Sequence, residues 1–248
     1  MSAGKAVHDG DAALVKGKPL PSARVPLNRE RVVQTALVYL EENGVASLSM
    51  RRLAQVLGVE AMSLYRHVPG KEDLLDAVVA RLVAELDDDP EVVRTPDDGW
   101  QDFLQRLAHG IRRVALGHPH AFPLVASRPP EAPWLRPPLR SLEWVELFLD
   151  GMIAQGFAPS VAVSAYRSFS SFLLGHLLLE VASLGADVGP LDVLDDGSPD
   201  YGGLEDFPRV GSLRAKLGED HSAAEFEEAL EALLERLGLL LKESDDSP

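Results

Sequence analysis

The chain has 248 residues, and its 46% of apolar residues is enough material for one large or two modest packed domains. It contains no cysteine, which excludes disulfide bonds, iron–sulfur clusters and thiolate chemistry. No segment is long and apolar enough to act as a signal peptide or to span a membrane, so we expect a soluble, cytoplasmic protein.

The formal net charge of −15 argues against nucleic-acid binding when taken alone, because contacts with phosphates depend largely on positive charge. The charge is, however, unevenly distributed along the chain. Residues 27–86 carry 7 positive and 8 negative side chains, whereas residues 87–248 carry 13 and 29. Within residues 50–71, four cations stand against the single acid Glu60. The cations are Arg51, Arg52, Arg66 and Lys71. The sequence therefore places a local positive patch in an acidic chain.

The N-terminal segment separates into a leader and a first helix. Residues 1–26 show no apolar periodicity and end in three prolines, so we expect a flexible leader. From Asn28, a suitable N-cap, apolar residues recur at helical spacing. Gly44 stands where a left-handed residue would end this helix.

Two short helices are predicted next. Ser49 is a suitable N-cap for the second helix, and Gly58 stops it after two turns. Glu60 begins the third helix, and Pro69 ends it because proline disfavours helical geometry at the residue before it. The residues of the third helix expected to face inward are Ala61, Leu64 and Val68.

A fourth, longer helix begins after Gly70, with Glu72 and Asp73 at its positive N-terminal end and an apolar stripe that runs to Leu86. An acidic run with two prolines then interrupts the pattern. We therefore predict a first domain over residues 27–86 and a second over 87–248.

The rest of the chain is predicted to be helical. Helical patterns occupy residues 100–116, 138–156, 160–184 and 223–241, and no alternating strand pattern competes with them. Residues 185–221 are rich in glycine, proline and acids, and we expect a long, mobile loop there, with room for a short helical turn. The predicted fold class is therefore all-α.

The second and third helices, joined by a turn around Gly58, form a helix-turn-helix pattern. The third helix would turn polar side chains outward over a width that fits the roughly 12 Å major groove of DNA. Arg51 can reach a guanine edge or a phosphate, and Lys71 lies in the first turn of the fourth helix beside unpaired N–H groups. The outward residues of the third helix are Met62, Ser63, Tyr65, Arg66 and His67. The simpler alternative is a surface helix whose charges only keep it hydrated.

The segment SMRRLAQVLGVEAMSLYRHVPGKEDLLDAV resembles the DNA-binding domain of the TetR family of bacterial transcriptional regulators, and the likeness covers residues 28–86. The resemblance implies DNA contacts from the second predicted helix, from the third and from the start of the fourth. Ala61 and Met62 stand where tetracycline repressors have more polar residues, and an apolar contact with a thymine methyl group would suit them. The full predicted DNA-binding set is Arg51, Ala61, Met62, Ser63, Tyr65, Arg66, His67 and Lys71.

The C-terminal part is more loosely similar to the tetracycline-repressor branch of this family, in GWQDFLQRLAHGIRRVAL and in the Ser-Arg-Pro at 127–129. In the family, the corresponding segments surround a cavity for a small-molecule effector. The residues expected to bind ligand are Phe103, Leu107, Ile111, His118, Phe122, Trp144, Phe148, Phe172 and His176. Trp134, Met152 and Phe169 lie on the same segments. Ordinary core packing is the alternative for each of these residues.

Small-molecule pockets usually combine apolar walls with a few polar groups. The polar candidates here are His109, His118, Arg128, His176 and Glu180, of which His118 and His176 are the leading pair. By the resemblance, tetracycline repressors hold a magnesium chelate of the drug with a histidine that the segment AFPLVASRP lacks here, so tetracycline is not the expected ligand.

Neither a metal site nor a cofactor is expected. Pro119 restrains the His-Pro-His at 118–120, and the chain has no cysteine to complete a site. The sequence contains no catalytic triad, no compelling carboxylate pair and no phosphate-binding glycine loop between a strand and a helix, so we do not expect an enzyme.

Together these features predict a ligand-responsive repressor that a small-molecule effector releases from a palindromic operator. A homodimer is expected through the helices over 160–182 and 223–241, because their apolar stripes are too long to leave in water. The stripe residues are Ala165, Phe169, Phe172, Leu230, Leu233, Leu234, Leu237 and Leu241. A helical enzyme and a partner-binding adaptor that does not bind DNA are the competing hypotheses.

Overall fold

The computed structural model describes residues 26–128, 135, 141–188 and 206–245, and these residues form helices and connecting turns with no strand among them. The predicted all-α fold is therefore confirmed. The predicted leader, except Pro26, lies outside the described residues, as does Trp134. No helix in the described ranges is long and apolar enough to cross a lipid bilayer.

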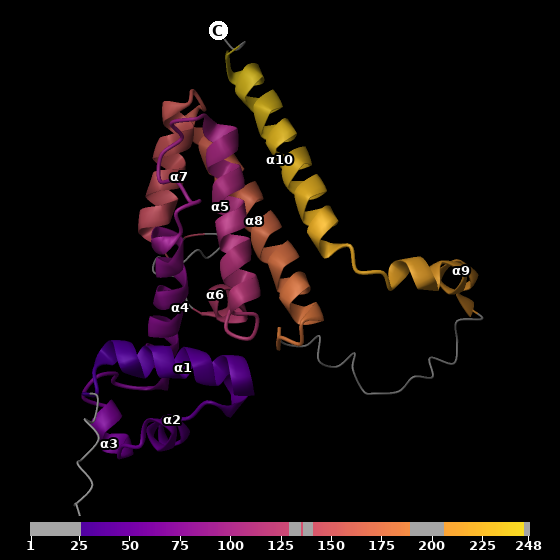
Figure 1. Ribbon diagram of the computed structural model, residues 1–248. Helices are drawn as coiled ribbons and strands as arrows, with labels where there is room; N and C mark the ends of the chain where they lie inside the picture. Colours follow the sequence, from indigo (N-terminus) through magenta and orange to yellow (C-terminus); the bar gives the residue numbers. More distant parts are fainter. Residues whose placement is uncertain (1–25, 129–134, 136–140, 189–205, 246–248) are drawn as a thin grey trace, which may run out of the picture.

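Residues 29–88 form a small N-terminal head and the helix that leaves it (Figure 1). The elements are α1 (Arg29–Asn43), the single turn η1 (Val45–Ser47), α2 (Met50–Leu57), α3 (Ala61–Leu64) and α4 (Lys71–Asp88). α1 packs against α2 and α4, and fully buried leucines fill the space between these helices. They include Leu37, Leu40, Leu53, Leu64 and Leu74.

The predicted helix ends of the head are largely confirmed. The Asn28 side chain accepts a hydrogen bond from the backbone N–H of Arg31 at 2.8 Å, and the Ser49 hydroxyl accepts one from Arg52 at 3.2 Å. Gly58 ends α2 in the left-handed region, with φ 66° and ψ 33°. Gly44 ends α1 with a positive φ of 72°, as predicted, although its ψ of 163° is extended rather than helical.

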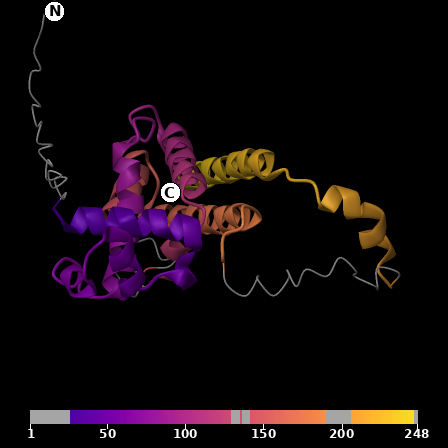
Figure 2. The same ribbon diagram turned by 60° about the horizontal axis from the view of Figure 1, so that its bottom comes forward.

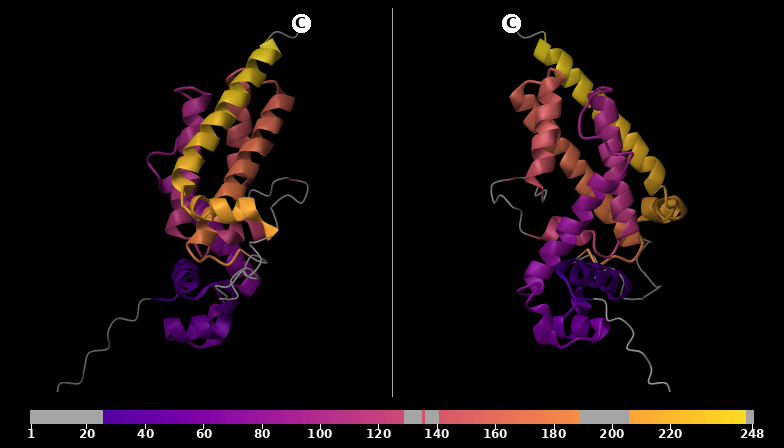
Figure 3. Two further views of the ribbon diagram at one scale, coloured as in Figure 1. Left: turned by 90° about the vertical axis from the view of Figure 1, so that its right-hand side faces the viewer. Right: turned by 60° about the vertical axis from the view of Figure 1, so that its left-hand side comes forward.

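Helices α5 to α8 and α10 form a larger body around the upper part of α4 (Figures 1 and 3). α7 and α5 both pack against α8, and α10 lies along α8. The elements are α5 (Trp100–Gly117), α6 (Pro123–Ser127), α7 (Leu142–Ala154), α8 (Pro159–Ser183), α9 (Pro208–Leu217) and α10 (Ser222–Asp245). The four predicted helices of this part are present, with ends shifted by a few residues wherever the ends are described.

Two helices were not predicted. α6 is five residues long and starts with Pro123, a favourable first helical residue. α9 lies inside the predicted loop over 185–221, so the loop prediction is wrong for Pro208–Leu217. The segment has local helix signals, namely Pro208 at the helix start and Arg214 and Lys216 in the last turn. The glycines around it favoured the prediction of a loop. Every residue of α9 is exposed, and the helix extends away from the body (Figure 2).

The apolar stripes of α8 and α10 are mostly buried within the chain itself. Ala165, Phe169, Leu230, Leu234 and Leu237 are each at most 6% exposed, because α10 packs on α8 and on the start of α5. The argument that a second chain must cover these stripes is therefore wrong. The large apolar side chains that α8 and α10 leave exposed are instead Val163, Leu179 and Leu239.

Candidate DNA-binding surface and internal cavity

α3 forms a single α-helical turn. After Leu64 the chain continues as tight turns, and the backbone N–H groups of His67 and Val68 both donate to the carbonyl of Leu64, at 2.8 and 2.9 Å. The prediction of a regular helix up to Val68 is therefore wrong at its C-terminal end. Pro69 disfavours helical geometry at Val68, the residue before it, but does not account for the earlier end of α3 at Leu64.

The exposure of the side chains around α3 matches the predicted inward and outward faces at five of eight positions, and the other three, Ala61, Ser63 and His67, are half-buried. Leu64 and Val68 are completely buried, whereas Met62 is 72% exposed and Tyr65 is 44% exposed. Ala61, predicted to face inward, is only half-buried. Of the other predicted DNA-binding residues, Arg51 and Arg66 are exposed, and Ser63, His67 and Lys71 are half-buried. All eight residues lie on α2, on or just after α3, or at the start of α4, at the head end of the molecule (Figure 1).

The cations of this surface lack acidic partners among the residues that the structure describes, unlike the arginines of α4, α5 and the neighbouring loops. Within the described residues, no acidic group lies within ion-pair distance of Arg51, Arg66 or Lys71. Six other arginines do form ion pairs, namely Arg81, Arg94, Arg106, Arg112, Arg113 and Arg128. The charge of the head is thus available to an external anion.

Polar contacts tie the head and α4 to the segment between α5 and α7. The Glu41 carboxylate of α1 accepts hydrogen bonds from the backbone N–H groups of His120 and Ala121, at 3.2 and 2.9 Å. His118 Nε2 lies 3.0 Å from a carboxylate oxygen of Glu85 on α4. Arg128, beyond α6, pairs with Asp76 at 2.9 Å and also with Glu72, in the first two turns of α4. The hydrogen bond that Arg128 donates to the Asp76 carboxylate raises the pKa of the Arg128 guanidinium.

A cavity of about 70 Å³ lies in the body between α4, α5, α7 and α8. Five of the predicted ligand-binding residues line it, namely Leu107, Ile111, Phe122, Trp144 and Phe148. α4 contributes Leu82, Val83 and Leu86, and α8 contributes Tyr166, Phe169 and Ser170 among others. The described residues of the wall include no charged side chain.

Four predicted ligand-binding residues lie outside this wall. Phe103 is fully buried in the core, with its ring centroid 6.5 Å from that of Phe148. His118 contacts Glu85, as described above, and its Nδ1 is buried without a partner among the described residues. Phe172 and His176 pack around Phe226 of α10, with ring centroids 5.6 and 5.3 Å from it. The leading histidine candidates are therefore not brought to the cavity. Met152, His109, Arg128 and Glu180 also lie outside its wall.

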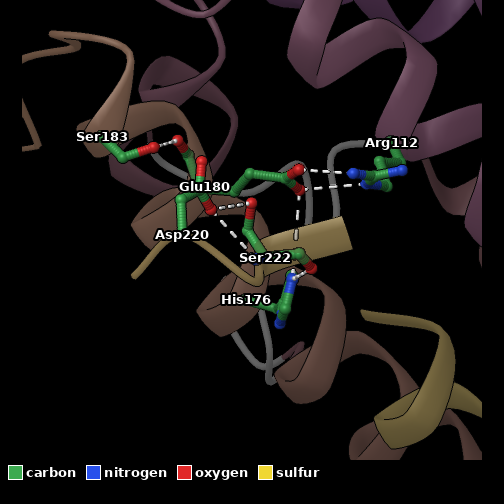
Figure 4. A network of polar contacts seen from close by, with 6 residues as sticks. All are labelled: Arg112, His176, Glu180, Ser183, Asp220 and Ser222. Atoms are coloured by element: carbon green, nitrogen blue, oxygen red, sulfur yellow. Dashed lines mark hydrogen bonds and ion pairs between the residues drawn. The ribbon is translucent and has the colours of Figure 1, made fainter. Parts of the chain in front are cut away.

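Arg112 and Glu180 instead form a partly buried ion pair between α5 and α8 (Figure 4). Two guanidinium nitrogens lie 3.0 and 2.5 Å from the Glu180 carboxylate, and the guanidinium stacks over the Phe226 ring at 5.1 Å. Hydrogen bonding to Glu180 raises the pKa of Arg112. His176 Nε2 lies 3.1 Å from the backbone oxygen of Ser222, at the start of α10. The network fastens α10 to the body.

Within the described ranges, no group of three or more histidine or acidic side chains is arranged to hold a metal ion. The surface on the head and the cavity in the body are two candidate recognition features of the described residues.

The chain matches two protein-family models. One, described as bacterial regulatory proteins of the tetR family, covers residues 32–78. The other, the tetracyclin repressor-like C-terminal domain, covers residues 93–240. The first match lies within the head and the first part of α4, and the second spans most of the body.

Relatives of known identity agree with the family models. The tetracycline repressor protein class D of Escherichia coli is 34% identical over 153 residues, which make up 61% of this chain and 66%, slightly under two thirds, of that protein. The class A repressor from transposon 1721 in Escherichia coli is 31% identical over 214 residues, or 85% of this chain and 90% of that repressor.

Solved structures share the fold. A possible TetR family transcriptional regulator from Streptomyces coelicolor A3(2) has a TM-score of 0.68 and 31% identity, over 86% of this chain and 100% of that chain. Streptomyces coelicolor ActR in complex with actinorhodin has a TM-score of 0.62 and 26% identity, over 86% of this chain and 97% of that chain. Because family models match both the head and the body, and relatives above 30% identity span most of the chain, the protein belongs to the tetR family of bacterial regulatory proteins.

Proposed function

We propose that this protein is a ligand-responsive transcriptional repressor, without enzymatic activity, that binds operator DNA through its head and a small molecule through the cavity of its body. The exposed surface of α2 and α3 supports this most directly, because its cations have no acidic partner among the described residues. Relatives named tetracycline repressors and the actinorhodin-bound ActR are consistent with both activities.

The residues of the head divide into two groups by their chemistry. Met62 and Ser63, on the exposed side of α3, are suited to read base edges in the major groove, with Met62 against a thymine methyl group. Arg51 can reach a guanine edge or a phosphate. Tyr65, His67 and Lys71 are suited to phosphate contacts, and Lys71 also lies at the N-terminus of α4, where backbone N–H groups favour anions.

The small cavity suggests how a ligand would weaken DNA binding. Its volume of about 70 Å³ is far below the roughly 300–1,000 Å³ of typical ligand pockets, so a ligand must push its walls apart. One wall is α4, and the same helix carries Lys71 and packs against α1. Displacement of α4 would therefore move the head. A coupling of about 1–3 kcal/mol would reduce operator affinity by about 5- to 150-fold.

The operator is proposed to be palindromic and the protein a homodimer. Two heads related by a two-fold axis would meet half-sites about one DNA turn, roughly 34–36 Å, apart. The exposed residues Val163, Leu179 and Leu239 are candidates for the contact between the two chains. The acids after residue 86 would favour an orientation with the body away from the phosphates.

An electrophoretic mobility shift with a duplex from the upstream region of the protein's own gene tests this function. Lys71→Ala should weaken binding to all sequences and reduce the slope of log affinity against log salt by about one unit. Met62→Ala and Ser63→Ala should instead alter base preference. Lys216→Ala, at an exposed lysine of α9, serves as the matched control and should leave binding unchanged.

The DNA-binding surface of the head is misassigned if the wild-type protein binds the duplex but neither the Lys71 nor the α3 variants change that binding. A helical enzyme or an adaptor protein would give no shift at all with any upstream duplex.

A further inference from the structure

Ser170 is a polar residue of the cavity wall, which also includes Ser141, Trp144 and Tyr166. It lies on α8, its side chain is 1% exposed, and its hydroxyl oxygen has no hydrogen-bond partner among the described residues. A buried hydroxyl without a partner is unfavourable, and a helical serine can usually bond to a backbone carbonyl of the preceding turn. A ligand that supplies the missing partner would therefore recover this free energy on binding.

The rest of the described wall offers little to a charged molecule. Apolar side chains from α4, α5 and α8 dominate it, together with the rings of Trp144, Phe148 and Phe169. The Ser141 hydroxyl already accepts a hydrogen bond from the backbone N–H of Trp144 at 3.2 Å. The nearby pair Arg112–Glu180 is satisfied between its own members and does not line the cavity. A ligand charge would therefore lose its hydration without gaining a partner.

We propose that the cavity takes a neutral, mainly aromatic ligand with a hydrogen-bonding group that pairs with the Ser170 hydroxyl. Aromatic rings suit this wall because offset and edge-on ring contacts add to the burial of apolar area. The inference rests on the proposed function only in treating this cavity as the effector site. Ser170 is then a specificity-determining residue, since it rewards ligands with a donor or acceptor over purely apolar ones of the same shape.

Three probes with the same ring system separate these contributions. Naphthalene is purely apolar, β-naphthol adds a neutral hydroxyl, and β-naphthoate adds a negative charge. Isothermal titration calorimetry of the full-length protein should show saturable binding of β-naphthol, with β-naphthoate weaker by about tenfold or more. Ser170→Ala should weaken β-naphthol by about threefold to tenfold, as expected for one neutral hydrogen bond. The same change should leave naphthalene affinity within about twofold, because naphthalene makes no hydrogen bond.

Ser164→Ala is the matched control on the same helix. Ser164 is exposed, and its hydroxyl donates to the Ser160 carbonyl at 3.0 Å, so its loss should change the affinity of none of the probes. Equal affinity for β-naphthol and β-naphthoate would overturn the proposal. So would an equal effect of Ser170→Ala on β-naphthol and naphthalene, or the absence of saturable binding by either neutral probe.

The mobility-shift assay on the same preparations keeps the two proposals distinguishable. A protein that binds the upstream duplex but fails the probe series would retain its proposed role and lose only this ligand chemistry. A protein that follows the expected probe series but binds no duplex would retain the ligand site and lose the role as a repressor.

Discussion

In the part of the chain that the structure describes, cationic side chains are of at least two kinds, those without an acidic partner in the head and those in ion pairs in the body. The cations of the head, Arg51, Arg66 and Lys71, are held without acidic partners among the described residues, whereas Arg112 is committed to Glu180 inside the body. The difference follows from solvation. An exposed cation remains hydrated and can exchange water for a phosphate, but a buried one needs a fixed counter-charge.

The Arg112–Glu180 pair provides a prediction at this scale. Glu180→Ala would leave the Arg112 guanidinium, with 20% side-chain exposure, partly buried without its counter-charge. We expect a loss of about 3 kcal/mol in the free energy of unfolding, as is typical when one member of a buried pair is removed. Urea unfolding followed by circular dichroism would measure it.

Glu227→Ala is the control for that prediction. Glu227 belongs to α10 and lies 3.4 Å from His109, but its side chain is 55% exposed. Its removal should change the free energy of unfolding by less than about 1 kcal/mol, because exposed ion pairs contribute little. Equal losses for the two variants would contradict the structural role assigned to Glu180.

At the scale of elements, α4 is the helix that joins the two halves of the molecule. Its first turns carry Lys71 and the partners of Arg128, and its later turns supply Leu82 and Leu86 to the cavity wall. The Glu41 contact with the backbone at His120 and Ala121 adds a second link between head and body. A shift of the cavity wall would therefore reach the head through packing and through these polar contacts together.

The packing of α5 yields a prediction for an element. A Cβ atom added at Gly110 would lie 2.3 Å from Cγ2 of Val92, in the segment that follows α4. Val92 is β-branched and packs against the core, so it has little freedom to move away. Gly110→Ala should therefore destabilise the protein by about 1–3 kcal/mol through overpacking, although alanine favours helices.

Gly117→Ala, in the last residue of the same helix, tests the same substitution without the clash. No atom lies within 4 Å of a Cβ added there, so the variant should be as stable as the wild type or slightly more stable. The melting temperatures of the two variants measure this difference in stability, and Gly110→Ala should melt at the lower temperature. If Gly110→Ala melts as high as Gly117→Ala, the close contact between α5 and Val92 is not maintained in solution.

At the scale of the whole molecule, the separation of charge is the main feature. The positive patch lies in the head, and most of the acids lie in the body and its connections. We expect such a molecule to approach DNA with its head first, because the acids after residue 86 outnumber the cations there and repel phosphates overall. The arrangement reconciles the net charge of −15 with DNA binding.

The proposed dimer is a prediction at this scale. Sedimentation velocity at micromolar concentration should find a species of two 26.9 kDa chains. Leu179→Asp, at a side chain on α8 with 65% exposure, should increase the fraction of monomer because it places a charge in the proposed contact. Val38→Asp, at a side chain on α1 with 48% exposure, is the control and should leave the dimer intact. A wild-type protein that sediments as a monomer would remove the case for a palindromic operator.

Local sequence determined much of the fold, because helix caps and apolar periodicity act over a few residues. Asn28 and Ser49 begin their helices and Gly58 ends its helix as predicted, since each satisfies backbone groups within its own turn. The buried positions of Leu64 and Val68 follow from the same periodicity and leave the outer side of α3 exposed. The family resemblance added the expectation that these outer residues contact DNA.

The cavity depended on contacts between residues distant in the sequence, and so the tertiary structure decided its composition. Phe122 and Trp144 line the cavity and Phe172 does not, although all three are aromatic and all three were expected to bind ligand. His176 lies against α10 rather than the cavity, and Ser170, which has no sequence signal, is left in the wall without a hydrogen-bond partner among the described residues. Periodicity shows which side of a helix is buried, whereas the packing of α4, α5, α7 and α8 determines which buried side chains face a cavity and which face another helix.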